Sequence, residues 1–137
     1  MLALRLIRLV EALPKGRSTD VMGRQLMRCG TSVGANYRAA CRAKSVPDMI
    51  AKLGIVEEEA DECLYWLELL VEAGHIPESQ VKSLMAETNE ILAMTVASIK
   101  TLRRKQTNPK SKIQNLKPKI QNWPVQNPQS KTQNCQP

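Results

Sequence analysis

The chain has 137 residues, of which 42 % are hydrophobic and 24 % are charged, and its formal net charge at pH 7 is +7. This length suits one small domain, provided that the apolar residues are concentrated enough to form a core. Phenylalanine is absent and aromatic residues make up only 3 %. The core must therefore be aliphatic, which favours helical layers and argues against a β-sheet protein.

The first predicted helix covers about residues 1–13. Leucines recur there in steps of four and three, at Leu2, Leu6, Leu9 and Leu13, which is the spacing of one helix face. The segment is short, apolar and basic like a targeting peptide, but Glu11 is unusual in such peptides. We therefore expect a structural helix at the start of the chain.

The second predicted helix begins with a cap at Ser18, Thr19 or Asp20 and runs to about Ala43. One side is apolar, and at 100° per residue four arginines point within about 40° of the opposite direction. Glycines on a flank between these sides allow another helix to approach closely, and Asn36 at the core edge needs a hydrogen-bond partner. The four arginines are Arg24, Arg28, Arg38 and Arg42.

The third predicted helix starts at a capping box, Ser45 to Asp48, and ends at Ala73 and Gly74. It carries an inner apolar seam and an outer seam. A helix that is apolar on two sides requires two partners. The outer seam therefore predicts a contact with another subunit, with a central helix in the core of one chain as the alternative. The inner seam is Met49, Leu53, Val56, Ala60, Cys63, Leu67 and Leu70, and the outer seam is Ile55, Glu59, Glu62, Trp66 and Leu69.

The fourth predicted helix spans about Glu78 to Arg104 and closes with basic residues, which suit the negative end of a helix dipole. Four helices with short connections predict an all-α, antiparallel up-down-up-down bundle over residues 1–105. The remainder, 106–137, is rich in Gln, Asn, Pro and Lys and has no helical or strand period. Such a composition predicts a disordered tail.

Charge is divided between the segments of the chain. Residues 1–45 contain nine Lys or Arg against two Asp or Glu, whereas residues 46–102 contain three against eleven. The basic side suits nucleic-acid phosphates; without aromatic side chains beside the arginines, such binding would be led by the backbone and sensitive to salt. The candidate contacts are Arg5, Arg8, Arg24, Arg28, Arg38, Arg42, Lys44, Arg103, Arg104 and Lys105.

A catalytic or metal site is not indicated. A di-metal site in a four-helix bundle needs Glu-x-x-His pairs from two helices, and this chain has one histidine. No Gly-rich phosphate loop is present, and the four cysteines form no CxxC pair. We expect no enzyme activity, cofactor, metal or small-molecule substrate. The unpaired cysteines and the absence of a long apolar run predict a cytoplasmic protein without a membrane partner.

Four segments of the chain also carry a family resemblance: residues 24–26 (RQL), 30–40 (GTSVGANYRAA), 48–62 (DMIAKLGIVEEEADE) and 65–67 (YWL). Over about residues 1–105 the chain resembles the bacterial four-helix bundle family of 23S rRNA intervening-sequence proteins. That family is similar in fold to the accessory variability determinant of diversity-generating retroelements, a five-membered ring that works beside a reverse transcriptase with nucleic acid. The resemblance implies a homopentamer, with RNA or DNA and a reverse transcriptase as candidate partners.

Two functions fit these expectations. The first is a nucleic-acid-binding accessory protein, in which an oligomer multiplies a weak basic patch. The second is a homo-oligomeric protein-interaction scaffold without nucleic-acid binding. In the scaffold, the arginines of the second helix would pair with the carboxylates of the third across the subunit contact.

Overall fold

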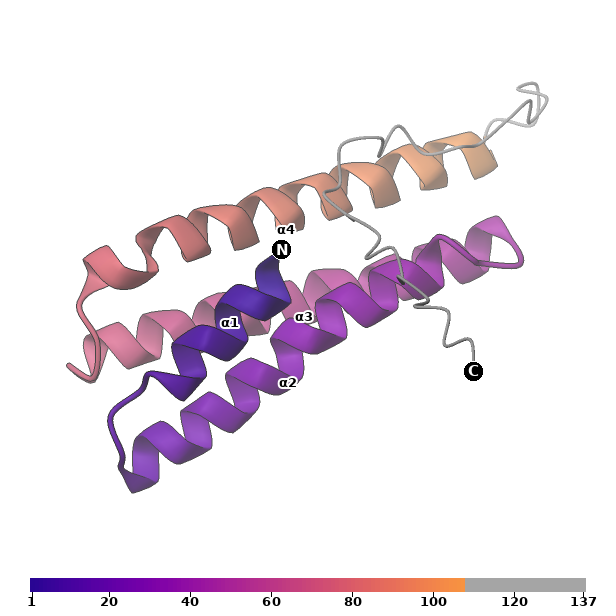
Figure 1. Ribbon diagram of the computed structural model, residues 1–137. Coiled ribbons are helices and arrows are strands. Elements are labelled where there is room, and N and C mark those ends of the chain that lie inside the picture. The colour runs from indigo at the N-terminus through magenta and orange to yellow at the C-terminus, as the bar shows by residue number, and fades with distance from the viewer. Residues whose placement is uncertain (108–137) are drawn as a thin grey trace, which may run out of the picture.

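The computed structural model describes residues 1–107, which form four α-helices and contain no strand (Figure 1). The helices are α1 (Leu2–Glu11), α2 (Arg17–Ala40), α3 (Val46–Glu72) and α4 (Glu78–Thr107). Helix α3 packs between α2 and α4, while α1 packs on α2 and α4. Each helix runs antiparallel to the one before it. The predicted up-down-up-down bundle is confirmed, and the expected disordered tail lies outside the described residues from 108 onward.

The predicted helix ends are confirmed for α3 and corrected for α2. The hydroxyl of Ser45 accepts a hydrogen bond from the backbone N–H of Asp48 at 3.3 Å. Gly74 ends α3 in the left-handed region at φ 71°, where glycine avoids the strain of a side chain. Helix α2, however, starts at Arg17 without a side-chain cap. The predicted cap Thr19 instead donates to the carbonyl of Pro14 at 2.7 Å and thereby secures the connection from α1.

The other helix ends differ by a few residues from the predicted ones. Helix α1 ends at Glu11, so the fourth leucine of its pattern, Leu13, lies in the connection. Helix α2 ends at Ala40 and not at Ala43, and α4 continues three residues beyond Arg104. None of the four helices in residues 1–107 is long and apolar enough to cross a membrane.

The inner seam of α3 forms the centre of the core, as predicted. All of its members are buried except Met49, which is half-buried near the end of the bundle. Two threonines of α4, Thr88 and Thr95, also lie in this core. Their hydroxyls donate to the carbonyls of Leu84 and Ile91 in the same helix, each at 2.8 Å. Their hydrogen bonds are thus satisfied without a partner on another helix.

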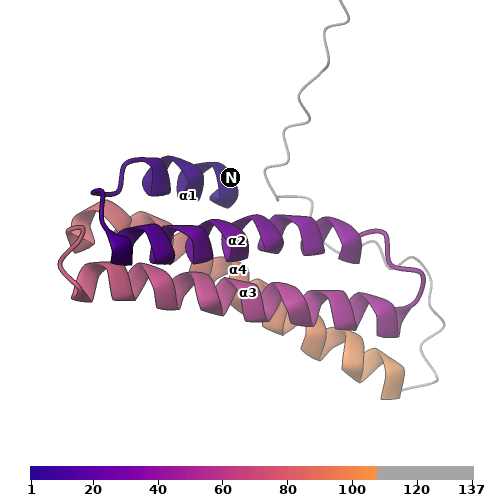
Figure 2. The same cartoon turned by 90° about the horizontal axis from the view of Figure 1, so that it is seen from below.

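Helix α1 is shorter than its neighbours and covers only part of α2 (Figure 2). The two helices approach closely at Gly30, where a Cβ atom would lie 2.1 Å from Cδ1 of Leu6. One turn further along α2, a Cβ at Gly34 would meet no atom within 4 Å. The expected close approach at the glycine flank therefore occurs at Gly30 and is absent at Gly34.

Candidate nucleic-acid interface

Arg28, in the middle of α2, is paired within its own chain. Its guanidinium donates to Glu59 at 3.2 Å and to Glu62 at 2.5 Å, both on α3. The bond to Glu62 raises the pKa of Arg28 and, together with the bond that the Trp66 indole donates at 3.1 Å, lowers the pKa of Glu62. The charge of Arg28 is therefore already neutralised by carboxylates of α3.

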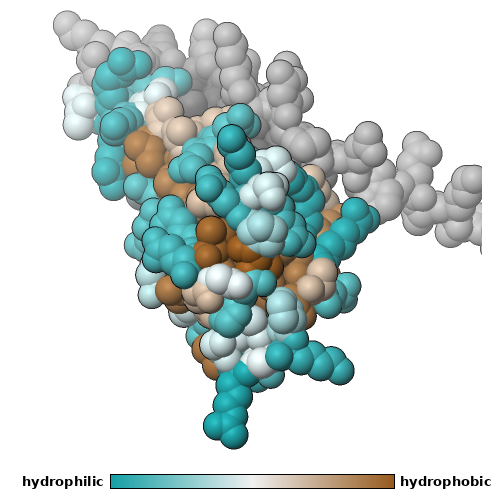
Figure 3. Space-filling view, turned by 90° about the vertical axis from the view of Figure 1, so that its left-hand side faces the viewer, coloured by the Kyte–Doolittle hydropathy of each residue, from teal (hydrophilic) through white to brown (hydrophobic). Residues whose placement is uncertain are grey.

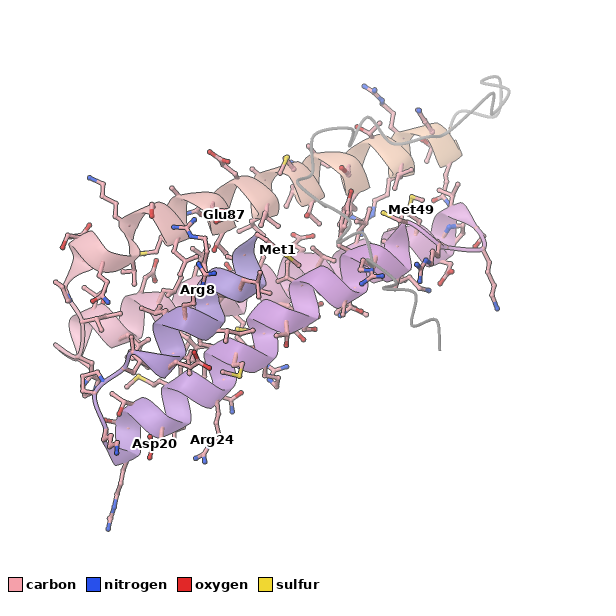
Figure 4. The ribbon with its side chains drawn as sticks, viewed as in Figure 1. Met1, Arg8, Asp20, Arg24, Met49 and Glu87 are labelled. Atoms are coloured by element: carbon pink, nitrogen blue, oxygen red, sulfur yellow. The ribbon has the colours of Figure 1, made fainter. Side chains whose placement is uncertain are left out.

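Arg5 of α1 is paired as well. Its guanidinium contacts the carboxylate of Glu87 on α4 and donates to the Ser83 hydroxyl at 2.7 Å. The N-terminal amine of Met1 lies 3.7 Å from the same carboxylate (Figure 4). Arg5 thus joins α1 to α4, and both it and Arg28 hold helices together.

The other eight predicted contacts are exposed, and none forms an ion pair within residues 1–107. Six of them gather at one end of the bundle, because α2 and α4 both finish there (Figure 1). We call this end, with the α2–α3 connection, the basic end. The remaining two, Arg8 and Arg24, lie toward the other half of the molecule (Figure 4). The members of the basic end are Arg38, Arg42, Lys44, Arg103, Arg104 and Lys105.

Carboxylates are scarce around the basic end. Asp48 is the only Asp or Glu in the ranges 38–56 and 91–107. It is occupied by the ammonium of Lys52 and by the backbone N–H of Lys44 at 3.0 Å, and these two contacts lower the pKa of Asp48. Phosphates approaching the end of α2 would therefore meet unpaired cations and one carboxylate that is already bound. Arg103 of α4, in contrast, lines a groove that also contains Glu57, Glu58 and Asp61 of α3.

Two exposed cations beyond those predicted extend the basic surfaces. Lys100 precedes Arg103 by three residues and Arg104 by four on α4, so it lies on the same side of that helix. Arg17 follows the direction of the arginine stripe of α2 at 100° per residue, seven residues before Arg24. Helical spacing alone could have identified both.

The outer seam of α3 lies partly against α2. Glu59 and Glu62 bind Arg28, while Trp66 and Leu69 are half-buried and pack against the core. Ile55 remains 40 % exposed. Tyr65, which the prediction did not include, is 54 % exposed, and its ring stands edge-on to Trp66 at 4.9 Å between centroids. Ile55 and Tyr65 are therefore the large apolar or aromatic side chains that α3 leaves to solvent.

The comparisons with known proteins assign the family. The model of the 23S rRNA-intervening sequence protein family matches residues 1–97. The chain belongs to this family. A crystal structure of a protein of unknown function from the S23 ribosomal protein family of Bacteroides thetaiotaomicron VPI-5482 is 39 % identical, with a TM-score of 0.68. The similarity covers 72 % of this chain and 92 % of that one. No functionally curated protein matches.

The family match confirms the predicted resemblance. It covers only some of the cations of the basic end. Arg38, Arg42 and Lys44 fall inside the matched range, whereas the cations at the end of α4 come after it. In this intervening-sequence family member the fold brings both groups to one end of the bundle, because α2 and α4 run in the same direction.

The opposite end of this intervening-sequence protein carries the α1–α2 and α3–α4 connections. Figure 3 looks onto it and shows a mostly hydrophilic surface around a central apolar patch. The hydroxyl of Ser18 and Nε2 of His75 lie 3.1 Å apart and link the first turn of α2 to the α3–α4 connection. His75, the one histidine of the chain, thus lies between α3 and α4.

The core cysteines are two buried thiols in contact with each other. Sγ atoms of Cys29 on α2 and Cys63 on α3 lie 3.0 Å apart, and both residues are buried. The contact with Cys29 and burial raise the pKa of the Cys63 thiol well above its usual range, so this thiol stays protonated. Within residues 1–107, no three His, Cys, Asp or Glu side chains are grouped to hold a metal ion.

Proposed function

We propose that this protein is a non-enzymatic, cytoplasmic accessory protein that binds nucleic acid through the phosphates, using its basic end. The observation that carries this proposal is the group of six exposed cations without an acidic partner in the described residues. Each phosphate neutralised by such a cation releases counterions and adds a salt-dependent increment of affinity. The family is named for 23S rRNA, which makes RNA the first ligand to test.

The proposal includes a homo-oligomer. Its five subunits are what the family's similarity in fold to the accessory variability determinant implies. Ile55 and Tyr65 on α3 supply exposed apolar and aromatic surface for such a contact. Several subunits would present several basic ends, and simultaneous contacts multiply a weak individual affinity. A reverse transcriptase is the candidate protein partner, because the accessory variability determinant works beside one.

The pairing of Arg28 argues against the alternative scaffold function. That function requires the arginines of α2 to pair with carboxylates of α3 in a neighbouring subunit. Arg28 instead meets Glu59 and Glu62 of its own chain, so these carboxylates are already engaged. An intersubunit pairing of Arg38 and Arg42 would have to use other carboxylates of α3, such as Glu57, Glu58 and Asp61.

Binding of a fluorescent single-stranded RNA, measured by anisotropy across a salt series, tests the nucleic-acid function. We expect the affinity of the parent to fall steeply with salt. The variant R38E/R42E/R103E/R104E should lose at least about 100-fold at low salt, and its log–log salt slope should shrink by roughly 3, at about 0.7 per lost phosphate contact.

A matched control distinguishes a specific loss of contacts at the basic end from a general effect of the change in net charge. The variant R8E/K15E/R17E/R24E makes the same charge change at exposed positions toward the opposite half, so it should lose only several-fold. Circular dichroism and light scattering verify that both variants keep their fold and assembly. No binding by the parent at low salt, an equal loss in both variants, or binding that disappears only when residues 108–137 are removed would each contradict the proposal.

The oligomer is tested by light scattering at micromolar concentration. Ile55→Asp should dissociate the assembly without loss of helix, because a buried unpaired charge is costly at an interface. Met94→Asp provides the control, since Met94 on α4 is 51 % exposed and lies off the outer seam. A monomeric parent, or equal dissociation by both changes, would refute this contact.

A further inference from the structure

A groove of about 520 Å³ runs between α3 and α4. The α3 wall is acidic, and the α4 wall is apolar except for Arg103 at one end, so three carboxylates stand against one cation. At Gly54, on the α3 wall, an added Cβ would meet no atom within 4 Å, so there is open room above the backbone. The lining residues are Gly54, Glu57, Glu58, Asp61, Leu92, Val96, Ile99 and Arg103.

The three carboxylates of this groove have no cationic partner. Glu57, Glu58 and Asp61 form no ion pair with any residue in the range 1–107. Half-buried Leu92 and Val96 face them from α4. The groove therefore suits a ligand that is both cationic and apolar, and its acidic wall repels the phosphates that the basic end would attract.

Residues 108–137 of the same chain have this chemistry. They contain five lysines and no Asp or Glu. From Lys110 to Trp123, four lysines and four apolar or aromatic side chains are interspersed among polar residues and one proline, in the order KSKIQNLKPKIQNW. The charge and the apolar content of this segment are thus complementary to the two walls of the groove.

The position of the segment also allows it to reach the groove. It follows Thr107, only one turn after Arg103, which lines the groove. From Thr107 back to Leu92, α4 rises about 22 Å at about 1.5 Å per residue. An extended chain at about 3.3 Å per residue covers this length in about seven residues. The 30 residues after Thr107 are therefore more than sufficient for the segment to turn back along α4.

We propose that residues 110–123 bind in the α3–α4 groove of their own chain. The lysines pair with Glu57, Glu58 and Asp61, and the isoleucines and the leucine of the segment pack against Leu92 and Val96. This inference does not depend on nucleic-acid binding. It places the segment's lysines on the acidic surface of the bundle and leaves the cations of the basic end other than Arg103, which lines the groove, as the free cationic surface.

Acrylamide quenching of Trp123 tests the proposal in the full-length chain. Replacing Trp66 by Phe leaves Trp123 as the sole tryptophan. In this background, Glu57→Lys, Glu58→Lys and Asp61→Lys together should lower the ratio of bound to free segment about tenfold, because each exposed ion pair contributes a factor of about two to three. Trp123 should then be quenched more strongly, and trypsin should cleave faster after Lys112 and Lys119.

The matched control carries the same charge reversal outside the groove, at Glu68, Glu72 and Glu90, which are exposed. Its quenching and cleavage should equal those of the parent, and 1 M salt should reproduce the groove variant in part. Equal quenching in the parent and the groove variant, or an equal rise in the control, would overturn the inference. Protection that disappears on dilution would show that the segment binds another copy, which also overturns it.

Discussion

The two parts of α2, residues 17–30 and residues 31–40, carry the same stripe of arginines but differ in what lies beside them. In the first part, Gly30 packs against Leu6 of α1, and Arg28 is held by two carboxylates of α3. In the second part, Gly34 faces open space, and Arg38 has no acidic partner in residues 1–107. The charge that a helix offers to a ligand therefore depends on its neighbours, and counting residues along the stripe does not determine it.

Thiol reactivity should show the largest difference between the two parts. Cys29 is buried in the first part, whereas Cys41, just after α2, is exposed. In a Cys135→Ser background, a maleimide should modify Cys41 at the rate of a free thiol. Cys29 and Cys63 should react at least about 1,000-fold more slowly, because labelling requires opening of the core. Timed labelling with mass spectrometry measures this, and similar rates at Cys29 and Cys41 would show that the α2–α3 core is loose.

Alanine substitutions at Gly30 and Gly34 should change the stability of the protein in opposite directions. Gly30→Ala places a methyl group against the buried Leu6, and we expect a loss of about 1–3 kcal/mol in the free energy of unfolding. Gly34→Ala, one turn away, adds helix propensity without a clash and should stabilise by about 0.5–1 kcal/mol. Urea unfolding of both variants gives these values. The same sign of change in the two variants would contradict the different packing of α1 against Gly30 and Gly34.

The pairing of Arg28 should produce a smaller effect, visible in the pH dependence of stability. The pKa of Glu62 is lowered in the folded chain, chiefly by the bond from Arg28. Its stabilising contribution is therefore present above the ordinary pKa of 4.5 and is lost as the pH falls through the lowered value. Glu62→Gln should flatten the decline of stability below pH 4.5 by less than about 1 kcal/mol, since the pair is exposed to solvent. If the free energy of unfolding falls in parallel with pH in parent and variant, the Arg28–Glu62 pair does not contribute to stability.

Much of the fold could be predicted because its signals are local. Ser45 and Asp48 lie three residues apart, Gly74 marks the end of α3, and the inner seam follows one helical period. The start of α2 could not be read in this way. Thr19 resembles a cap in sequence, but the structure uses its hydroxyl to bind Pro14, which belongs to the preceding connection.

The candidate site was harder to predict because pairing depends on contacts between distant segments. Periodicity gives the direction of a side chain around its own helix, but not which side chain of another helix it meets. Arg5 and Glu87 are 82 residues apart in sequence, and Arg28 and Glu62 are 34 apart. The paired and unpaired cations could therefore be separated only after the helices were packed.

The internal hydrogen bonds of Thr88 and Thr95 have a consequence for motion. These hydroxyls bind their own helix, and no other side-chain hydrogen bond or ion pair joins α3 to α4 in the described part of the chain. The direct contact between α3 and α4 is therefore apolar, and within residues 1–107 side-chain polar contacts hold α4 to the other helices only through Arg5 and the N-terminal amine, whereas Arg28 ties α2 directly to α3. We expect α4 to slide along α3 in small shear movements while α2 and α3 move as one body. Such sliding would change the distance between Arg103 on α4 and Arg38 on α2. It would thereby change the spacing of the phosphates that the two helices can contact at the same time.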